Sequence, residues 1–75
     1  MRLLVTGGSG FIGTNLVQQA LGQGVQVLNL DWNPPLKPAH RPWWREWDIM
    51  DAGATARHLA EFRPTDVVHR AARTD

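Results

Sequence analysis

Three glycines near the start of the chain have the spacing of a phosphate-binding turn. Gly8, Gly10 and Gly13 follow the short apolar run 3–5 and precede residues 12–21, whose apolar side chains recur at helical spacing. A strand, a glycine turn and a helix can together bind the pyrophosphate of a dinucleotide, because the unpaired N–H groups of the first helical turn face the anion. The pattern therefore predicts a dinucleotide-binding turn.

Each of these glycines has an expected geometric role. We expect Gly8 to adopt the positive φ that turns the chain out of the strand, Gly10 to let the diphosphate approach the main chain, and Gly13 to let the helix lie close on the strand. The competing P-loop pattern requires Lys and then Ser or Thr after its last glycine. Here Thr14 and Asn15 follow, which disfavours nucleoside-triphosphate hydrolysis. A simple strand-to-helix turn is the other alternative.

An aspartate at the end of the second predicted strand indicates which dinucleotide is preferred. Asp31 follows Gly13 by eighteen residues, directly after the apolar segment 25–30. A carboxylate at this point can accept hydrogen bonds from both hydroxyls of the adenosine ribose, and it repels a 2′-phosphate. Trp32 and Asn33 supply no compensating positive charge. The sequence thus favours NAD over NADP, the alternative being an aspartate that only begins a turn.

Composition and charge argue against several other classes of function. The 75-residue chain has a formal net charge of +1 with 20% charged residues, so neither nucleic acid nor an anionic membrane is an expected partner. It has no cysteine, and its three histidines are far apart and lack acidic neighbours at ligand spacing, so we expect neither disulfides nor a metal site. The N-terminal apolar run is too short for a signal peptide or a membrane span, and we expect a cytoplasmic protein.

The elements alternate in the order typical of a parallel α/β sheet. We expect strands over residues 2–6, 25–30, 44–49 and 66–69, and helices over 11–21 and from an N-cap at residue 51 to about 62. Residues 32–42 hold four of the five prolines, so a proline-rich loop replaces the second crossover helix. Right-handed parallel crossovers then predict the N-terminal part of a Rossmann-type doubly wound parallel sheet, an α/β fold of strand order 3-2-1-4.

Three tryptophans follow the proline-rich segment, and they have two interpretations. Trp43, Trp44 and Trp47 lie among arginines, a combination that can stack single-stranded nucleic acid. The near-neutral net charge disfavours that role. We interpret them instead as large side chains that cover the sheet where the helix is missing.

Four motifs stand in order along the chain: Thr6-Gly7-Gly8-Ser9-Gly10-Phe11-Ile12-Gly13, Asp31, Asp48-Ile49 and His69-Arg70-Ala71-Ala72. Together they resemble the extended short-chain dehydrogenases/reductases, specifically the NAD-dependent epimerase/dehydratase group that acts on nucleotide sugars. The resemblance spans the whole chain, and four motifs in the right order are more specific than any one of them.

The resemblance implies a phosphate-binding role for the first motif. Gly7, Gly10 and Gly13 correspond to the pyrophosphate loop of the family. Phe11 and Ile12 correspond to the start of the helix, where they contribute backbone and packing.

The resemblance also indicates which residues contact the other parts of the cofactor. Asp31 corresponds to the residue that holds the adenosine ribose. Asp48 and Ile49 correspond to the residues that contact the adenine, the carboxylate through the amino group and the isoleucine against the ring. The residues that border the diphosphate and nicotinamide side are Ala71, Ala72 and Arg73.

Two departures from the family pattern limit what this chain can do alone. Arg70 stands where the family usually has a leucine, and a charge beside a buried strand is costly unless it reaches water or a partner. The catalytic Tyr-x-x-x-Lys of the family has no counterpart here, since the chain has no tyrosine and its only lysine is Lys37. Without that acid/base, hydride transfer has no proton partner.

We therefore predict that residues 1–75 are a partial NAD(P)-binding Rossmann domain without a catalytic residue. They would form the N-terminal part of a nucleotide-sugar epimerase or dehydratase, an oxidoreductase-type enzyme with transient hydride transfer at a sugar hydroxyl. A nucleotide-sugar substrate is expected only for a full-length protein. The possibility that such a protein is a homodimer is also left open. Two alternatives stay open as well: a non-catalytic module that binds or senses NAD(P), and a fragment without independent function.

Overall fold

The computed structural model describes residues 1–71, in which four strands form one parallel sheet. The strands are β1 (Arg2–Thr6), β2 (Gln26–Asp31), β3 (Trp44–Glu46) and β4 (Asp66–His69). They are connected by the α-helices α1 (Phe11–Gly22) and α2 (Ala52–Phe62) and by the 3₁₀ helix η1 (Pro38–Trp43). The strand order β3-β2-β1-β4 confirms the predicted 3-2-1-4 sheet.

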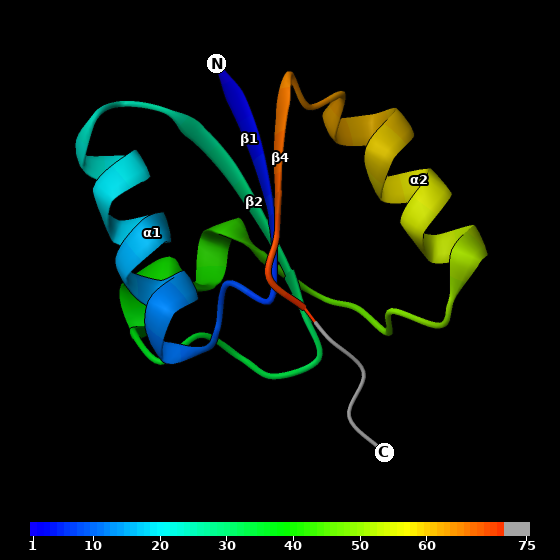
Figure 1. Cartoon of the computed structure of the whole chain (residues 1–75), viewed down its shortest axis with the longest axis horizontal. Helices are drawn as coiled ribbons and strands as arrows, with labels where there is room; N and C mark the ends of the chain where they lie inside the picture. Colours follow the sequence, from blue (N-terminus) through cyan, green and yellow to red (C-terminus); the bar gives the residue numbers. More distant parts are fainter. Residues whose placement is uncertain (72–75) are drawn as a thin grey trace.

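The sheet lies between α1 on one face and α2 on the other (Figure 1). Because successive side chains of a strand point to opposite faces, the apolar runs of β1 and β2 supply two separate clusters. The cluster on the α1 face is formed by Leu3, Val5, Val17, Ala20 and Val27. The cluster on the α2 face is formed by Leu4, Leu28, Leu30 and Trp47. Strands buried on both faces are typical of parallel sheets.

The second helix begins and ends as the sequence predicts. The Asp51 carboxylate accepts a hydrogen bond from the Ala54 N–H at 2.9 Å, which caps the helix N-terminus. Arg63 follows the last turn in a left-handed conformation, with φ at 54°, and Pro64 prevents continuation. None of the residues of α2 is buried.

The crossover from β2 to β3 differs from the prediction in two respects. The sequence predicts only loop over residues 32–42, whereas η1 spans Pro38–Trp43. Pro38 is compatible with this because the first turn of a helix does not need its N–H. The third strand ends at Glu46 instead of residue 49. The Trp47 N–H still donates to the Asp31 carbonyl at 3.1 Å, and then the chain leaves the sheet.

The three tryptophans of the crossover are buried to different extents. Trp47 is 6% exposed and belongs to the cluster on the α2 face, as the sequence predicts. Trp44 is half-buried, and its Nε1 donates to the Asp31 carbonyl at 3.0 Å. Trp43 is exposed. Trp47, and in part Trp44, therefore cover the sheet, whereas Trp43 does not.

Two features are absent from the described part of the chain. No helix within residues 1–71 is both long and apolar enough to cross a membrane. The same residues contain no group of three or more His, Asp or Glu side chains placed to hold a metal ion.

Candidate functional site

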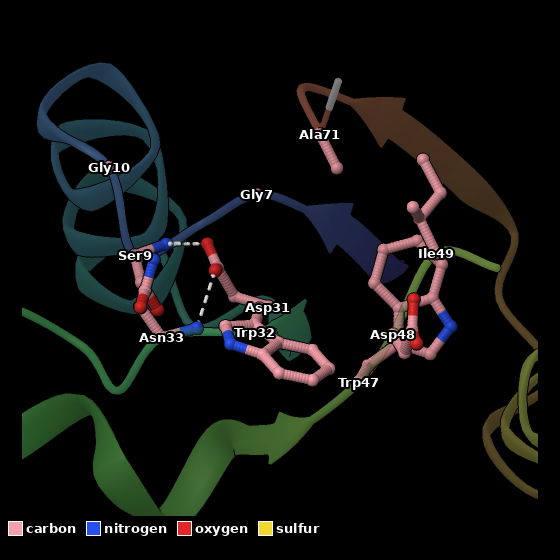
Figure 2. A pocket seen from close by; sticks show the side chains of 10 residues that line it. All are labelled: Gly7, Ser9, Gly10, Asp31, Trp32, Asn33, Trp47, Asp48, Ile49 and Ala71. Atoms are coloured by element: carbon pink, nitrogen blue, oxygen red, sulfur yellow. Dashed lines mark hydrogen bonds between the residues drawn. The ribbon is translucent and has the colours of Figure 1, made fainter. Parts of the chain in front are cut away.

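A cavity of about 540 Å³ opens at the carboxyl edge of the sheet (Figure 2). Since the strands are parallel, the residues that follow each of them meet at this edge. The cavity is lined by Gly7, Ser9, Gly10, Asp31, Trp32, Asn33, Trp47, Asp48, Ile49 and Ala71. It includes the junction of β1 and β4, where the direction of winding reverses, and doubly wound sheets bind their ligands at this point.

Gly7, rather than Gly8, makes the sharp turn out of β1. Gly7 has a φ of 75°, while Gly8 is not among the positive-φ residues. The prediction for Gly8 is therefore wrong. A Cβ on Gly7 would lie 2.7 Å from the Ala71 nitrogen, so β1 and β4 approach closely here. A side chain at position 8 is excluded by a different contact, since a Cβ on Gly8 would lie 2.5 Å from Asn29 Oδ1.

Gly13 and Gly10 allow two different close approaches. A Cβ on Gly13 would overlap the Gly7 oxygen and lie 2.6 Å from the Gly8 Cα. At Gly13 the first turn of the helix therefore packs against the glycine turn, while Val17 and Ala20 further along α1 pack on the strands. At Gly10, among the described residues, an added Cβ would meet only the Gly7 oxygen, at 3.8 Å. Gly10 is the N-cap of α1 and has no side chain to cap it, so its backbone faces open space beside unpaired N–H groups.

The Asp31 carboxylate is held by two backbone N–H groups (Figure 2). Its Oδ2 accepts from the Ser9 nitrogen and its Oδ1 from the Asn33 nitrogen, both at 2.9 Å. A carboxylate has about four acceptor positions, so two are left for a ligand. Asp31 thus connects the end of β2 to the glycine turn and presents a fixed acceptor to the cavity.

Asn29 supports the turn from inside the sheet and is not among the residues that the sequence singles out. It is 1% exposed, its Oδ1 accepts from the Gly8 nitrogen at 2.8 Å, and its Nδ2 donates to Ser9 Oγ at 3.1 Å. Buried polar groups are nearly always hydrogen-bonded. An amide in the middle of the apolar segment 27–30 is the signal that points to such a role.

Thr6 joins the ends of β1 and β4. Its buried Oγ1 accepts from the Arg70 nitrogen at 3.1 Å and from the Ala71 nitrogen at 3.3 Å, and it lies 2.6 Å from His69 Nδ1. A hydroxyl has one hydrogen and two lone pairs. The Arg70 N–H is shared between this hydroxyl and the Thr6 carbonyl, which lies at 2.8 Å. Thr6 therefore ties the end of β1 to His69 and to the residues that follow β4.

The structure brings some of the predicted site residues together at this cavity and places others beside it. The predicted residues that line the cavity are Gly7, Gly10, Asp31, Asp48, Ile49 and Ala71. An adjoining hollow of about 280 Å³ is lined by Gly7, Gly10, Phe11, Ile12, Gly13 and Arg70. Ala72 and Arg73 lie outside the described residues. The cavity residues that the sequence does not single out for the site are Ser9, Trp32, Asn33 and Trp47.

The side chains of the adjoining hollow face solvent. Phe11 is 80% exposed and Ile12 is 60% exposed, so neither side chain packs into the core at the start of α1. Arg70 is also exposed, and its main-chain N–H donates to the Thr6 carbonyl at 2.8 Å. The cost expected for a charge beside a buried strand is therefore avoided, because the side chain reaches water.

The fold and the cavity define the N-terminal part of a Rossmann-type doubly wound domain, with a glycine turn at the switch point of the sheet. Residues 3–75 match the model of the NAD dependent epimerase/dehydratase family, and the chain belongs to this family.

Relatives and solved structures agree with this membership. The dTDP-glucose 4,6-dehydratase of Xanthomonas campestris is 61% identical over 78 aligned positions, which cover 92% of this chain and 22% of that protein. A 3 beta-hydroxysteroid dehydrogenase/Delta 5→4-isomerase of Mycobacterium tuberculosis is 54% identical over 57 residues, 73% of this chain and 15% of that protein. The crystal structure of Thermus thermophilus UDP-glucose 4-epimerase in complex with NAD superposes with a TM-score of 0.84 at 40% identity, covering all of this chain and 25% of that one. The chain thus spans a quarter or less of these relatives.

Proposed function

We propose that this chain is the NAD-binding N-terminal portion of an epimerase or dehydratase that acts on a nucleotide sugar. The observation that carries the proposal is the cavity at the carboxyl edge of the sheet, where the open backbone of Gly10 lies beside the fixed carboxylate of Asp31. The dTDP-glucose 4,6-dehydratase and the NAD-bound UDP-glucose 4-epimerase among the relatives support the cofactor and the substrate class.

The residues around the cavity fit the successive parts of NAD. The unpaired N–H groups at the start of α1 and the positive end of the helix dipole favour the diphosphate near Gly10. The free acceptor positions of Asp31 suit the two hydroxyls of the adenosine ribose. Asp48 and Ile49, which line the cavity after β3, offer an acceptor for the adenine amino group and an apolar contact for its ring. The cavity volume lies within the usual range of small-molecule sites.

Charge around the cavity favours NAD over NADP. Asp31 and Asp48 both line it, and none of the described lining residues is Lys, Arg or His. A 2′-phosphate on the ribose would therefore meet negative charge without a compensating cation, and like charges at short range repel.

The contribution of this chain to the chemistry is binding and orientation. When bound, NAD supplies a reversible hydride acceptor for oxidation of a hydroxyl. Proton transfer at that hydroxyl needs a general acid/base, and residues 1–75 contain no tyrosine. We place the proton-transferring group and the substrate site in a part of the full-length protein outside these residues.

A second candidate substrate class is supported by the hydroxysteroid dehydrogenases among the relatives. The 54% identity to the mycobacterial hydroxysteroid dehydrogenase/isomerase over 57 residues favours oxidation of a steroid hydroxyl as the alternative. Both activities require the same cofactor-binding portion, so they differ in the protein outside this chain. Turnover of dTDP-glucose or UDP-glucose, compared with a 3 beta-hydroxysteroid, by the full-length protein distinguishes them.

Calorimetric titration of the chain with NAD and NADP tests the proposed cofactor site. We expect NAD to bind more tightly than NADP. In Gly10→Ala, the new methyl group has room in the protein but occupies the approach to the diphosphate, so NAD affinity is expected to fall by about tenfold or more with little change in stability.

Gly22→Ala is the matched control for this experiment. Within residues 1–71 an added Cβ at Gly22 meets nothing within 4 Å, and the position is at the far end of α1 from the cavity. NAD affinity should be unchanged. A folded wild-type chain that gives no binding heat with either cofactor contradicts the proposed function.

A further inference from the structure

Trp32 is a large aromatic side chain that faces a cavity instead of the protein core. It directly follows Asp31, is 65% exposed and lines the cavity of about 540 Å³. In Figure 2 its indole extends from the end of β2 toward the side of the cavity formed by Trp47 and Asp48. Aromatic rings stabilise a protein chiefly by burying their faces, and most of the surface of this ring is still available for a contact.

The main chain around Trp32 is nevertheless held in place. The Asn33 N–H donates to Asp31 Oδ1 at 2.9 Å, a hydrogen bond that bridges residue 32. The Asp31 carbonyl accepts from Trp44 Nε1 at 3.0 Å and from the Trp47 nitrogen at 3.1 Å. These bonds attach both sides of residue 32 to the sheet and the crossover. The indole is therefore presented from a fixed backbone position.

We propose that Trp32 stacks on the adenine of the bound dinucleotide. With Asp48 and Ile49 it would form the binding site for this base. The inference rests on the proposed function, because the adenine is attached to the ribose assigned to Asp31. A base on that ribose lies within reach of the next residue in the chain. Trp32 would supply an aromatic face, Ile49 an aliphatic contact and Asp48 an acceptor at the edge, and all three line the same cavity.

The stacking contact and the edge contact depend on different parts of the base. Stacking uses the π-face and tolerates changes of ring substituents, whereas the Asp48 carboxylate requires the amino group as a donor. Three probes separate them: NAD, the hypoxanthine analogue of NAD, which lacks that amino group, and nicotinamide mononucleotide, which lacks the whole adenosine monophosphate half.

Calorimetry of the 75-residue chain with these probes tests the inference. Trp32→Ala is expected to weaken NAD and the hypoxanthine analogue by the same factor, about tenfold, and to leave nicotinamide mononucleotide unaffected. Trp32→Phe keeps an aromatic face and should retain most of the affinity. Asp48→Asn is expected instead to reduce the preference for NAD over the hypoxanthine analogue.

Trp43→Ala and Trp43→Phe are the matched controls. Trp43 is also exposed but belongs to η1 and does not line the cavity. Its alanine variant should bind NAD like the wild type. We also expect the change in tryptophan fluorescence on NAD binding to shrink in Trp32→Phe and to persist in Trp43→Phe.

The outcomes separate this inference from the proposed function. A wild-type chain that binds NAD while Trp32→Ala binds it equally tightly overturns the stacking role and leaves the cofactor site standing. Equal losses in the Trp32 and Trp43 alanine variants, or a loss that extends to nicotinamide mononucleotide, also overturn it, because they indicate a general structural effect. A folded wild-type chain that does not bind NAD removes both proposals.

Discussion

The Asp31 carboxylate has a structural task and a proposed binding task at once. It accepts hydrogen bonds from the Ser9 and Asn33 backbone nitrogens, which orient it toward the cavity. Because these bonds leave acceptor positions free, the same group can hold a ribose without rearrangement. In the proposed site its negative charge, rather than its shape, would discriminate against a 2′-phosphate.

Asp31→Asn tests the role of that charge. Asparagine keeps the size of the side chain and one acceptor oxygen, so we expect NAD affinity to fall by about tenfold, in line with the loss of hydrogen bonds to a charged group. NADP affinity should fall less or rise, because the repulsion of the 2′-phosphate is removed. Calorimetric titration with both cofactors measures the two changes.

Glu61→Gln provides the charge-matched control for this prediction. It removes one negative charge from α2, outside the set of residues that line the cavity. Both affinities should stay at their wild-type values. Equal losses of NAD and NADP in Asp31→Asn would contradict the assignment of Asp31 to the ribose.

At the scale of elements, η1 is attached to α1 through a buried histidine. His40 is 4% exposed, and its Nε2 lies 3.0 Å from Gln18 Oε1. Since an amide oxygen only accepts, Nε2 carries the proton. Nδ1 is buried without a hydrogen-bond partner in the described part of the chain. Burial, and secondarily the positive charge of Lys37, lower the pKa of His40 below its ordinary value of 6.5.

This arrangement predicts that the chain loses stability in mild acid. The unfolded state binds the His40 proton at a higher pH than the folded state does, so the stabilising contribution is present above pH 6.5 and is lost as the pH falls through the lowered pKa. Urea unfolding measured between about pH 5 and 8 reports this dependence. His40→Gln should flatten it, because glutamine does not titrate.

His58→Gln on α2 is the control for the pH experiment. This change also removes a histidine, but at a half-buried position on a different element. The variant should keep the wild-type dependence of the unfolding free energy on pH. If His40→Gln loses as much stability in acid as the wild type does, protonation of His40 is not the cause of that loss.

At the scale of the whole molecule, the two faces of the sheet are covered unequally. On the α1 face, Val5 and Val17 are fully buried. Figure 1 shows α2 over the other face. A cavity of about 410 Å³ lies between this helix and the sheet, and it is lined partly by Leu59 and Val67. Val67 is 56% exposed. Leu30 in the cluster on this face is fully buried, so the looser packing is confined to the region between α2 and β4.

Two identical substitutions on the two faces measure this asymmetry. Val5→Ala removes buried methyl groups and should lower the free energy of unfolding by about 2 kcal/mol. Val67→Ala should change it by about 0.5 kcal/mol or less, as is usual for exposed positions. Both residues lie in strands, β1 and β4, so the loss of strand propensity is common to them. If urea unfolding shows that both variants lose the same free energy of unfolding, the α2 face is as tightly packed as the α1 face.

Local sequence determined the order and type of the elements. Apolar runs of strand length, helical spacing after the glycines and the Asp51 cap are properties of neighbouring residues, and they predicted the 3-2-1-4 sheet that the structure has. The crossover was harder to predict, because η1 is a short 3₁₀ segment whose prolines are typical of loop. The glycine spacing and Asp31 likewise located the cavity, since parallel strands place such residues at one edge.

Tertiary structure alone decided how these residues are arranged within the site. Gly7 takes the left-handed turn at the point where the end of β4 lies against it, a contact between residues more than sixty positions apart. Asn29 holds the glycine turn from the neighbouring strand, and Trp32 faces the cavity because the crossover holds the backbone beside it. Such contacts depend on the register of the neighbouring strands and on how the segments that follow them pack together. Spacing along the chain does not contain that information, so only the folded sheet reveals it.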